Sequence, residues 1–293
     1  MSDEISLAFM VIDGLKIANE MYTALAKEVR ELQVRSNVNP KLAVVLVVKN
    51  PASLSYIKQK QKACVKTDIK WEQFNYAEDV TTEQLIEKIN ELNENELIHG
   101  ILVQLPLPKS INVPLVIRAI DPKKDVDGFT AYNIGKMFLG TEFEDLAPCT
   151  PLGVIKMLEY YDIPVKGKEV VIVGHSNIVG KPLSAMLLNR NATVTTCHID
   201  TKDLAFHTKR ADIICVGVGK IGLITADMVK DGVVVIDIGC NKDKDGKLKG
   251  DVDFEGIEKK ASYITPVPGG AGPMTVACLM LNTVKAAKRL NNL

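Results

Sequence analysis

The stretch VVIVGHSNIVGKPL, Val170–Leu183, decides the fold of the second half of this chain. Four β-branched residues lead straight into Gly174, and a helical pattern begins at about Pro182. A glycine directly after a buried strand permits a tight turn, and the amides of the following helix can face a pyrophosphate. The spacing departs from the usual GxGxxG pattern, because Ser176 stands at the second glycine position and Gly180 comes later. The stretch alone predicts either a dinucleotide-binding turn or a tight turn without a ligand.

The strands expected around this turn favour the cofactor site. Short runs rich in β-branched residues, each ending at or near glycine, recur at Glu169–Val173, Thr193–Cys197, Ala211–Val216 and Val233–Ile238, with a helix around Pro182–Asn189. This layout is typical of a doubly wound nucleotide-binding domain. The chain closes with a helix at about Met274–Arg289.

The first half of the chain alternates helical and strand patterns in a different style. Helices are expected at Leu15–Leu32, from Ser53 to about Thr67 and at Thr82–Asn93, and strands at Leu42–Val48, Lys70–Asn75 and Gly100–Gln104. Such alternation predicts a mostly parallel sheet. The loop-rich stretch Asp121–Pro151 separates the two halves. We therefore expect a two-domain α/β protein with a cleft between the domains: an N-terminal α/β substrate domain, residues 1–122, and a doubly wound, Rossmann-like cofactor domain, residues 123–293, whose closing helix, 274–289, packs back on the first domain.

Composition excludes several classes of function. The chain has 36 Lys and Arg residues and 36 Asp and Glu residues, so it lacks the basic excess of a general nucleic-acid binder. The longest apolar run, Leu42–Val48, is far shorter than the roughly 20 residues of a membrane helix. The N-terminus carries Asp3 and Glu4 instead of a basic segment, which argues against a signal peptide. Six scattered cysteines form no CxxC pair, so we expect no metal site, reduced thiols and a cytoplasmic location.

Tyr56 and Lys60 are four residues apart, so they share one face of the expected helix. A tyrosine ring can stack on a flat heterocycle, and a desolvated lysine beside it would have a lowered pKa and could pass protons. The alternative is an ordinary amphipathic surface helix. Short-chain dehydrogenases also contain YxxxK, but there the pair follows the cofactor turn, whereas here it precedes Gly174.

Five further segments carry a specific resemblance. They are PASLSYIKQKQKAC (51–64), VQLPLP (Val103–Pro108), KDVDGF (Lys124–Phe129), PCTPLG (148–153) and TPVPGGAGPMT (Thr265–Thr275). Together they resemble the bifunctional methylenetetrahydrofolate dehydrogenase/methenyltetrahydrofolate cyclohydrolase family, over nearly the whole chain and in the family's order. The resemblance implies oxidation of 5,10-methylenetetrahydrofolate to 5,10-methenyltetrahydrofolate with a nicotinamide cofactor, followed by hydrolysis to 10-formyltetrahydrofolate. It also implies a homodimer.

The resemblance assigns roles to individual residues. Lys60 matches the catalytic lysine, Gln104 the glutamine that tunes it, Tyr56 the tyrosine lying on the folate, and Asp127 the aspartate that holds the pterin ring. The implied substrate contacts are Tyr56, Lys60, Val103, Gln104, Leu105, Asp127, Pro268, Gly269, Gly270, Gly272 and Pro273. The implied cofactor contacts are Gly174, His175, Ser176, Ile199, Asp200 and Cys240.

Structural alternatives remain for these matches. Asp127 could cap a turn before Gly128, and Gln104 could satisfy backbone groups at a strand end. The Pro-Gly loop could be purely architectural. Two functional alternatives are also open: a dehydrogenase that has lost the cyclohydrolase step, and a non-catalytic folate or nucleotide sensor.

The choice between NADP and NAD depends on the residues at the end of the expected strand Thr193–Cys197. Asp200 in CHIDT points toward NAD, because an acidic side chain there favours a free ribose 2′-hydroxyl. A protonated His175, Lys181 or Lys202 could compensate. His175 stands where the family has an arginine that commonly meets the 2′-phosphate, and Ile199 stands where it often has a small polar residue. The family's usual bacterial cofactor is NADP, and NADP is our prediction, with NAD as the alternative. Cys240, Ala271, Lys49 and Asp68 are further departures.

Overall fold

The computed structural model describes residues 9–47 and 51–293, with the side chains of 51–55 left out. Val48 and Lys49, named above, lie outside the described residues. Two compact units make up the chain. Unit 1 comprises Met1–Ile17 and Thr150–Thr275, and unit 2 comprises Ala18–Cys149 and Val276–Leu293. The units thus divide at residue 149 where the sequence suggested residue 122, and each contains segments from distant parts of the chain.

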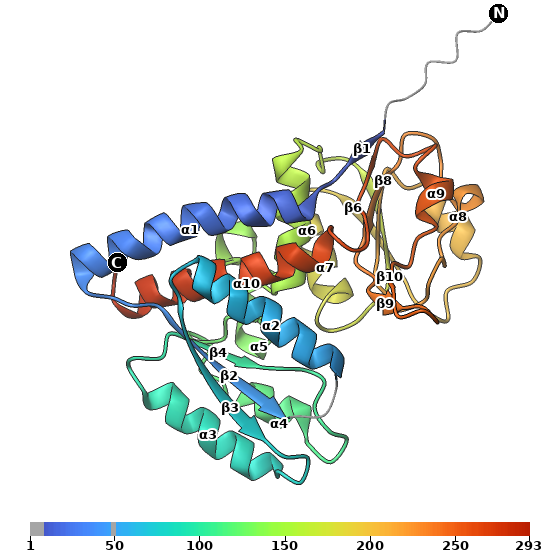
Figure 1. Ribbon diagram of the computed structural model, residues 1–293. Coiled ribbons are helices and arrows are strands. Elements are labelled where there is room, and N and C mark those ends of the chain that lie inside the picture. The colour runs from blue at the N-terminus through green and yellow to red at the C-terminus, as the bar shows by residue number, and fades with distance from the viewer. Residues whose placement is uncertain (1–8, 48–50) are drawn as a thin grey trace, which may run out of the picture. The chain divides into compact units, whose positions relative to one another are not determined.

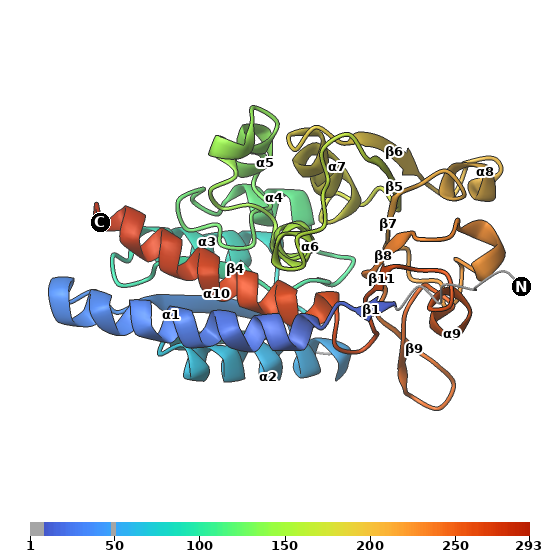
Figure 2. The same ribbon diagram turned by 90° about the horizontal axis from the view of Figure 1, so that it is seen from above.

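Unit 1 contains a six-stranded sheet in which every neighbouring pair is parallel. In spatial order the strands are β1 (Met10–Val11), β11 (Tyr263–Ile264), β8 (Val234–Asp237), β7 (Ile213–Val216), β5 (Glu169–Val173) and β6 (Thr193–Cys197). Figure 2 shows the strands in this order. The two strands that follow β5 in the chain lie on opposite sides of it. The winding direction therefore reverses at β5, and ligands of such sheets bind outside the carboxyl ends at this point.

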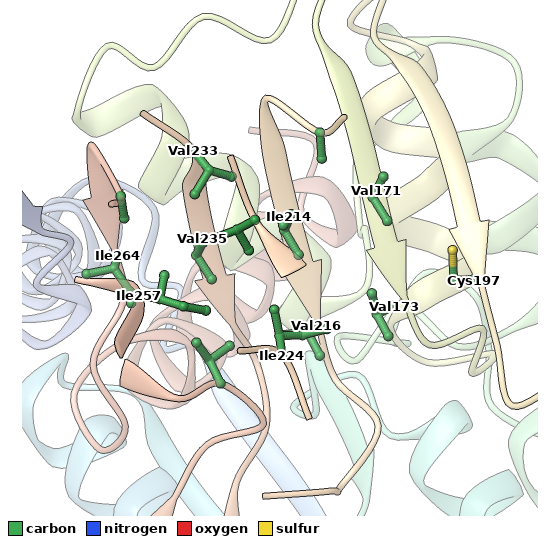
Figure 3. Close-up of a cluster of buried hydrophobic side chains, with 14 residues drawn as sticks. Val171, Val173, Cys197, Ile214, Val216, Ile224, Val233, Val235, Ile257 and Ile264 are labelled. Carbon is green, nitrogen blue, oxygen red and sulfur yellow. The ribbon is translucent and has the colours of Figure 1, made fainter. Parts of the chain in front are cut away.

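Alternate residues of these strands build the core of unit 1. Val171 and Val173, Ile214 and Val216, and Val235 belong to one buried cluster, with Ile264 of β11. Figure 3 shows these side chains on adjacent strands. Residues two apart in a strand share a face, so this pattern covers one whole face of the sheet with β-branched side chains. A core of this kind requires β-branched runs in the sequence, and those runs are the pattern that predicts the strands.

Unit 2 contains a three-stranded parallel sheet with β2 (Lys41–Val47) between β3 (Lys70–Tyr76) and β4 (Gly100–Val103). β2 is buried along almost its whole length, as a strand covered on both faces requires. Helix α3 (Thr82–Glu94) packs into a cluster with alternate residues of β2 and β4. In Figure 1, α2 (Pro51–Lys66) and α10 (Ala271–Leu290) lie on the other side of this sheet.

The remaining elements are mostly short. They are the helices α1 (Gly14–Ser36), α4 (Val113–Arg118), α5 (Ala131–Met137), α6 (Cys149–Tyr160), α7 (Gly180–Leu188), α8 (Leu204–Thr208) and α9 (Phe254–Ile257), the 3₁₀ turns η1 (Thr141–Phe143) and η2 (Ala226–Met228), and the hairpin β9 (Asn241–Lys242) and β10 (Leu248–Lys249). Across residues 9–47 and 51–293, no helix has the length and apolarity needed to cross a membrane.

The loop-rich stretch 121–151 holds more regular structure than the sequence suggested. It contains α5, η1 and the start of α6. Helix α5 is only seven residues long and has Gly135 near its middle, and a glycine there weakens the helical pattern. Thr130 caps α5 by accepting a hydrogen bond from the Asn133 amide. The helix therefore depends on its cap and its packing more than on its own propensity.

Candidate active site

A buried lysine and a glutamine meet in unit 2. Lys60 lies on α2 and is 8% exposed, and its Nζ donates a hydrogen bond to Oε1 of Gln104 over 2.9 Å. Tyr56 lies one turn earlier and is 36% exposed, and Lys58 and Lys62 are exposed as well. The helix thus turns one lysine inward and leaves its neighbours in water. This differs from an ordinary amphipathic surface helix, in which all the lysines are solvated.

Gln104 directly follows β4, and both ends of its amide are occupied. Its Nε2 donates to the backbone oxygen of Leu105 over 2.6 Å, and its own backbone amide donates to Val45. Because the amino group faces a carbonyl, the side-chain oxygen faces the Lys60 ammonium. Gln104 therefore both satisfies a backbone carbonyl and contacts Lys60. Val103, the last residue of β4, is buried behind them.

The turn of KDVDGF is capped by Asp125. Its carboxylate accepts hydrogen bonds from the backbone amides of Gly128, Phe129 and Thr130, at 2.9, 3.1 and 2.7 Å, and from the Asn133 side chain. In the sequence, this capping role is an alternative to pterin binding for Asp127. The structure gives it to the earlier aspartate, so Asp127 does not need to serve the turn.

Lys124 anchors the same motif to α3. Its Nζ is buried and donates to the backbone oxygens of Leu92, Asn93 and Asn95, at 3.1, 2.7 and 2.8 Å. These carbonyls lie at the end of α3, where a cation interacts favourably with the helix dipole. Burial lowers the pKa of Lys124. Sequence reasoning missed both Lys124 and Asp125 as supports of Asp127. The available signal was two charged residues directly before the apolar Val126.

The Asp127 carboxyl is surrounded by protein atoms and lies near several ionisable groups, although part of the residue's surface is accessible. Burial of its carboxyl raises the pKa of Asp127, and the charge of Lys60 opposes that effect. The Asp125 carboxylate raises the pKa further, and a hydrogen bond with Cys149 lowers it. The Cys149 thiol is itself buried and contacts the backbone oxygen of Val126 at 3.3 Å. Unit 2 therefore brings Lys60, Gln104 and Asp127 into one neighbourhood.

The glycine-bearing turn of unit 1 lies at the carboxyl end of β5. Gly174 has a φ of +119°, and a Cβ there would lie 2.7 Å from the backbone oxygen of Gly217. A Cβ at Gly180 would lie 2.0 Å from the Gly174 oxygen. Among the described side chains, none caps the start of α7, but the Lys181 and Leu183 amides donate to the backbone oxygens of Ser176 and Val179, and Pro182 has no N–H. Ser176 is exposed and accepts from the Val179 amide. The two glycines therefore make a close turn here, and its use for a cofactor pyrophosphate stays a prediction.

Two histidines and an aspartate lie at the ends of β5 and β6. The rings of His175 and His198 are 5.0 Å apart between centroids. His198 Nδ1 lies 3.9 Å from the Asp200 carboxylate and accepts a hydrogen bond from the Asp200 backbone amide over 3.3 Å. Asp200 and Ile199 are strongly exposed, and Cys240 is exposed as well. Asp200 is therefore a solvated residue whose carboxylate stays close to an imidazole.

Two buried carboxylates hold the loops after β7 and β8. Asp237 accepts from the backbone amides of Gly239, Asp251 and Val252. Asp251 in turn accepts from the amides of Val218 and Gly219, at 2.6 and 2.9 Å. Burial raises the pKa of Asp237 to about 6. Sequence reasoning missed this pair, because only the folded loops bring the two carboxylates together.

The predicted site residues are divided between the units. Tyr56, Lys60, Val103, Gln104, Leu105 and Asp127 belong to unit 2, and the Pro-Gly loop Pro268–Pro273 and all the predicted cofactor contacts belong to unit 1. Within unit 1 the loop also supports α1, because the Gly269 oxygen accepts from the Leu15 amide over 2.9 Å. The loop thus has an architectural role in its own unit.

Comparison with known proteins covers both units. The model of the tetrahydrofolate dehydrogenase/cyclohydrolase catalytic domain matches residues 12–127, and that of the tetrahydrofolate dehydrogenase/cyclohydrolase NAD(P)-binding domain matches residues 148–291. The bifunctional protein FolD of Nautilia profundicola is 56% identical over 278 residues, covering 95% of this chain and 97% of that protein.

Two solved structures are also similar. The Campylobacter jejuni bifunctional enzyme FolD is 48% identical with a TM-score of 0.94, covering 96% of this chain and 99% of that chain. The Trypanosoma brucei FolD complexed with NADP cofactor and inhibitor is 35% identical with a TM-score of 0.92, covering 96% and 98%. These matches confirm the resemblance and the two-domain α/β fold. The chain therefore belongs to the tetrahydrofolate dehydrogenase/cyclohydrolase family.

Proposed function

We propose that Lys60 transfers the protons in the cyclohydrolase reaction of this bifunctional methylenetetrahydrofolate dehydrogenase and methenyltetrahydrofolate cyclohydrolase. The observation that carries this proposal is the buried hydrogen bond from Lys60 to Gln104. It holds the amino group in one place without adding a second charge, because glutamine is neutral. A positioned amine is able to act as a general acid and base.

In the dehydrogenase step, this chain's residues bind and orient the folate. The Asp127 carboxylate accepts paired hydrogen bonds from the pterin amino group and ring N–H, and the Tyr56 ring lies on the flat heterocycle. A nicotinamide cofactor, held at the glycine-bearing turn after β5, would supply the acceptor for the hydride of the methylene carbon. Loss of that hydride leaves the cationic methenyl product.

The cyclohydrolase step moves one proton through Lys60 and releases another. Water attacks the electrophilic methenyl carbon, and Lys60 takes the proton that the water loses, which leaves a carbinol. Lys60 then returns this proton to N5 of the pterin ring as the bond from the carbon to N5 breaks. The hydroxyl proton of the carbinol leaves to water as the C=O bond forms, and the formyl group remains on N10. One group serves both transfers because the proton that it removes is the proton that it delivers.

Replacement of Lys60 by methionine tests the proposal. We expect Lys60→Met to lose nearly all cyclohydrolase activity, while circular dichroism shows a retained fold. Lys58→Met is the matched control, because Lys58 is on the same helix and exposed. Full cyclohydrolase activity in Lys60→Met would remove the lysine from the mechanism. Accumulation of methenyl product by the unaltered protein would instead favour a dehydrogenase-only enzyme, and tight binding without turnover would favour a sensor.

We also propose NADP as the cofactor. The His175 and His198 rings lie together beside the turn, and their ring N–H groups can donate hydrogen bonds to a 2′-phosphate. The Trypanosoma brucei relative was solved with NADP. Asp200 is the opposing observation, since its carboxylate favours NAD. Steady-state assays with each cofactor should give measurable turnover with NADP, and binding of 2′,5′-ADP should be tighter than binding of 5′-AMP. A hundredfold preference for NAD would overturn this choice.

We further propose that the protein is a cytoplasmic homodimer. No disulfide joins the six cysteines, all of which lie in the described part of the chain, as a reducing compartment requires. The dimer is carried over from the family resemblance. Sedimentation velocity on the purified protein tests it, and a single monomeric species at micromolar concentration would contradict it.

A further inference from the structure

One asparagine on the last helix ties together two distant segments of unit 2. Asn282 of α10 is fully buried, and its Nδ2 donates hydrogen bonds to the backbone oxygens of Val126 and Ala147, both over 2.9 Å. The same nitrogen lies 3.7 Å from the Cys149 sulfur. The two carbonyls belong to segments far from α10 in the sequence. A single amide thus fixes how three segments meet.

Both carbonyls adjoin Asp127. Val126 directly precedes it, and Ala147 lies two residues before Cys149, which shares a hydrogen bond with the Asp127 carboxyl. On the other side of Asp127, a Cβ at Gly128 would lie 2.6 Å from the backbone of Leu146 and Ala147. The backbone on each side of Asp127 therefore lies in close contact with Asn282 or with the segment 146–147, whose Ala147 carbonyl Asn282 binds.

Asn282 has both a stabilising and a geometric effect. Its amino group satisfies two buried backbone oxygens, which stabilises the fold. Because both donors belong to one planar amide, they also fix the distance between the Val126 and Ala147 carbonyls.

We propose that Asn282 is a positioning residue for Asp127: by holding the Val126 and Ala147 carbonyls together, it sets the direction in which the Asp127 carboxylate meets the pterin ring. This inference rests on the proposed role of Asp127 in binding the pterin. Asn282 itself touches neither substrate nor cofactor in this role. Lys124 and Asp125 support the same motif from the other side, through α3 and the turn before α5.

The test compares two nearly isosteric replacements on adjacent residues of α10. Asn282→Leu removes both donors, whereas Thr283→Val removes a buried hydroxyl that donates to Leu279 within the same helix. We expect Asn282→Leu to raise KM for methylenetetrahydrofolate about tenfold, the effect of one misplaced charge-assisted hydrogen bond. The KM for NADP and the binding of 2′,5′-ADP stay unchanged, and Thr283→Val leaves both KM values near those of the unaltered protein. An equal folate KM in the two variants would overturn the proposal. Asn282→Ala, with the same expected rise, is the second variant if Asn282→Leu does not fold.

A double-mutant cycle separates this proposal from the role of Asp127. If Asn282 acts through the carboxylate, Asn282→Leu adds no further rise in folate KM to a protein that already carries Asp127→Asn. Independent, additive effects would overturn the positioning role. If Asp127→Asn alone leaves the folate KM unchanged, the role of Asp127 in binding fails, and an effect of Asn282→Leu would then have another cause.

Discussion

Two aspartates two residues apart carry out different tasks in unit 2 because their surroundings differ. Asp125 receives three backbone amides and a side-chain amide, so its oxygens are committed to the turn. Asp127 faces Lys60 and Cys149 instead, in a packed environment that raises its pKa. A family motif with two acidic residues thus separates into Asp125, which builds the loop, and Asp127, which is left for the pterin contact proposed above.

The raised pKa of Asp127 predicts a pH dependence of folate binding. On acidification Asp127 takes up a proton at a higher pH than an ordinary aspartate, and the protonated carboxyl is a poorer acceptor for the pterin donors. We expect KM for methylenetetrahydrofolate to rise as the pH falls through this pKa. Asp127→Asn should have a higher KM that changes little with pH. A KM of the unaltered protein as flat as that of the variant would contradict the prediction, and KM for NADP in the same buffers is the control.

Spacing in the sequence relates only residues that are near in the chain. Tyr56 and Lys60 are one helical turn apart, so their spacing relates them, whereas the relation of Gln104 to Lys60 comes from the family resemblance. Lys124 and Asn282 escaped notice because their partners lie on elements distant in the chain. The charged pair before Val126 marks an unusual position in the sequence, but it does not reveal that the lysine binds three carbonyls at the end of α3.

Among the elements, α3 depends on contacts at both ends. Its first turn has a capping box, in which Thr81 accepts from the Gln84 amide and the Gln84 side chain accepts from the Thr81 amide. Its last turn relies on Lys124, which comes from a different segment. The helix therefore couples the packing of the small sheet to the motif that carries Asp127.

Removal of that lysine should destabilise unit 2. Lys124→Met leaves buried carbonyls at the end of α3 without their donor, which costs about 1–3 kcal/mol. Urea unfolding followed by circular dichroism measures the change, and Lys123→Met on the exposed neighbouring residue is the matched control. Equal midpoints for the two variants would show that the Lys124 contacts contribute nothing to stability.

The buried strands of four or more residues could be predicted from sequence, and the two-residue strands could not. β5 has the expected bounds, and the bounds of β2, β4, β7 and β8 differ by one or two residues, because runs of β-branched residues in a covered parallel sheet leave a continuous apolar pattern. The edge strand β6 also has the expected bounds, although it is mostly unburied, because its threonines and valine are β-branched. β1 and β11 contain two residues each, which is too short for any period to appear. Their pairing depends on the completed sheet.

In the molecule as a whole, the two units are expected to respond to acid in opposite directions. His99 in unit 2 is buried, its Nδ1 accepts from the Lys41 amide, and burial together with nearby Lys124 and Lys41 lowers its pKa to about 4. Its stabilising contribution is present above pH 6.5 and is lost as the pH falls toward 4. Asp237 in unit 1 has a pKa of about 6, so its contribution is present at low pH and is lost as the pH rises from 3.8 to 6.

At about 1.4 kcal/mol for each unit of pKa, the effect is at most about 3.5 kcal/mol for His99 and about 3 kcal/mol for Asp237. Hydrogen exchange corrected for its intrinsic rate should show, between pH 6.5 and pH 4, weaker protection around His99 and stronger protection around Asp237. His99→Gln should reduce the first change and leave the second. A loss of protection around Asp237 equal to that around His99 would contradict the assignment of these groups.

The pairing of β1 with β11 also constrains how the protein is made. Met10 must remain without its sheet neighbour until Tyr263 has left the ribosome, and unit 2 likewise waits for Val276–Leu293. Neither unit is a continuous piece of the nascent chain, so neither can finish folding during most of translation. Apolar strand edges are exposed for that interval, and such edges promote aggregation. We therefore expect the growing chain of this enzyme to be protected from aggregation by chaperones until α10 has been synthesised.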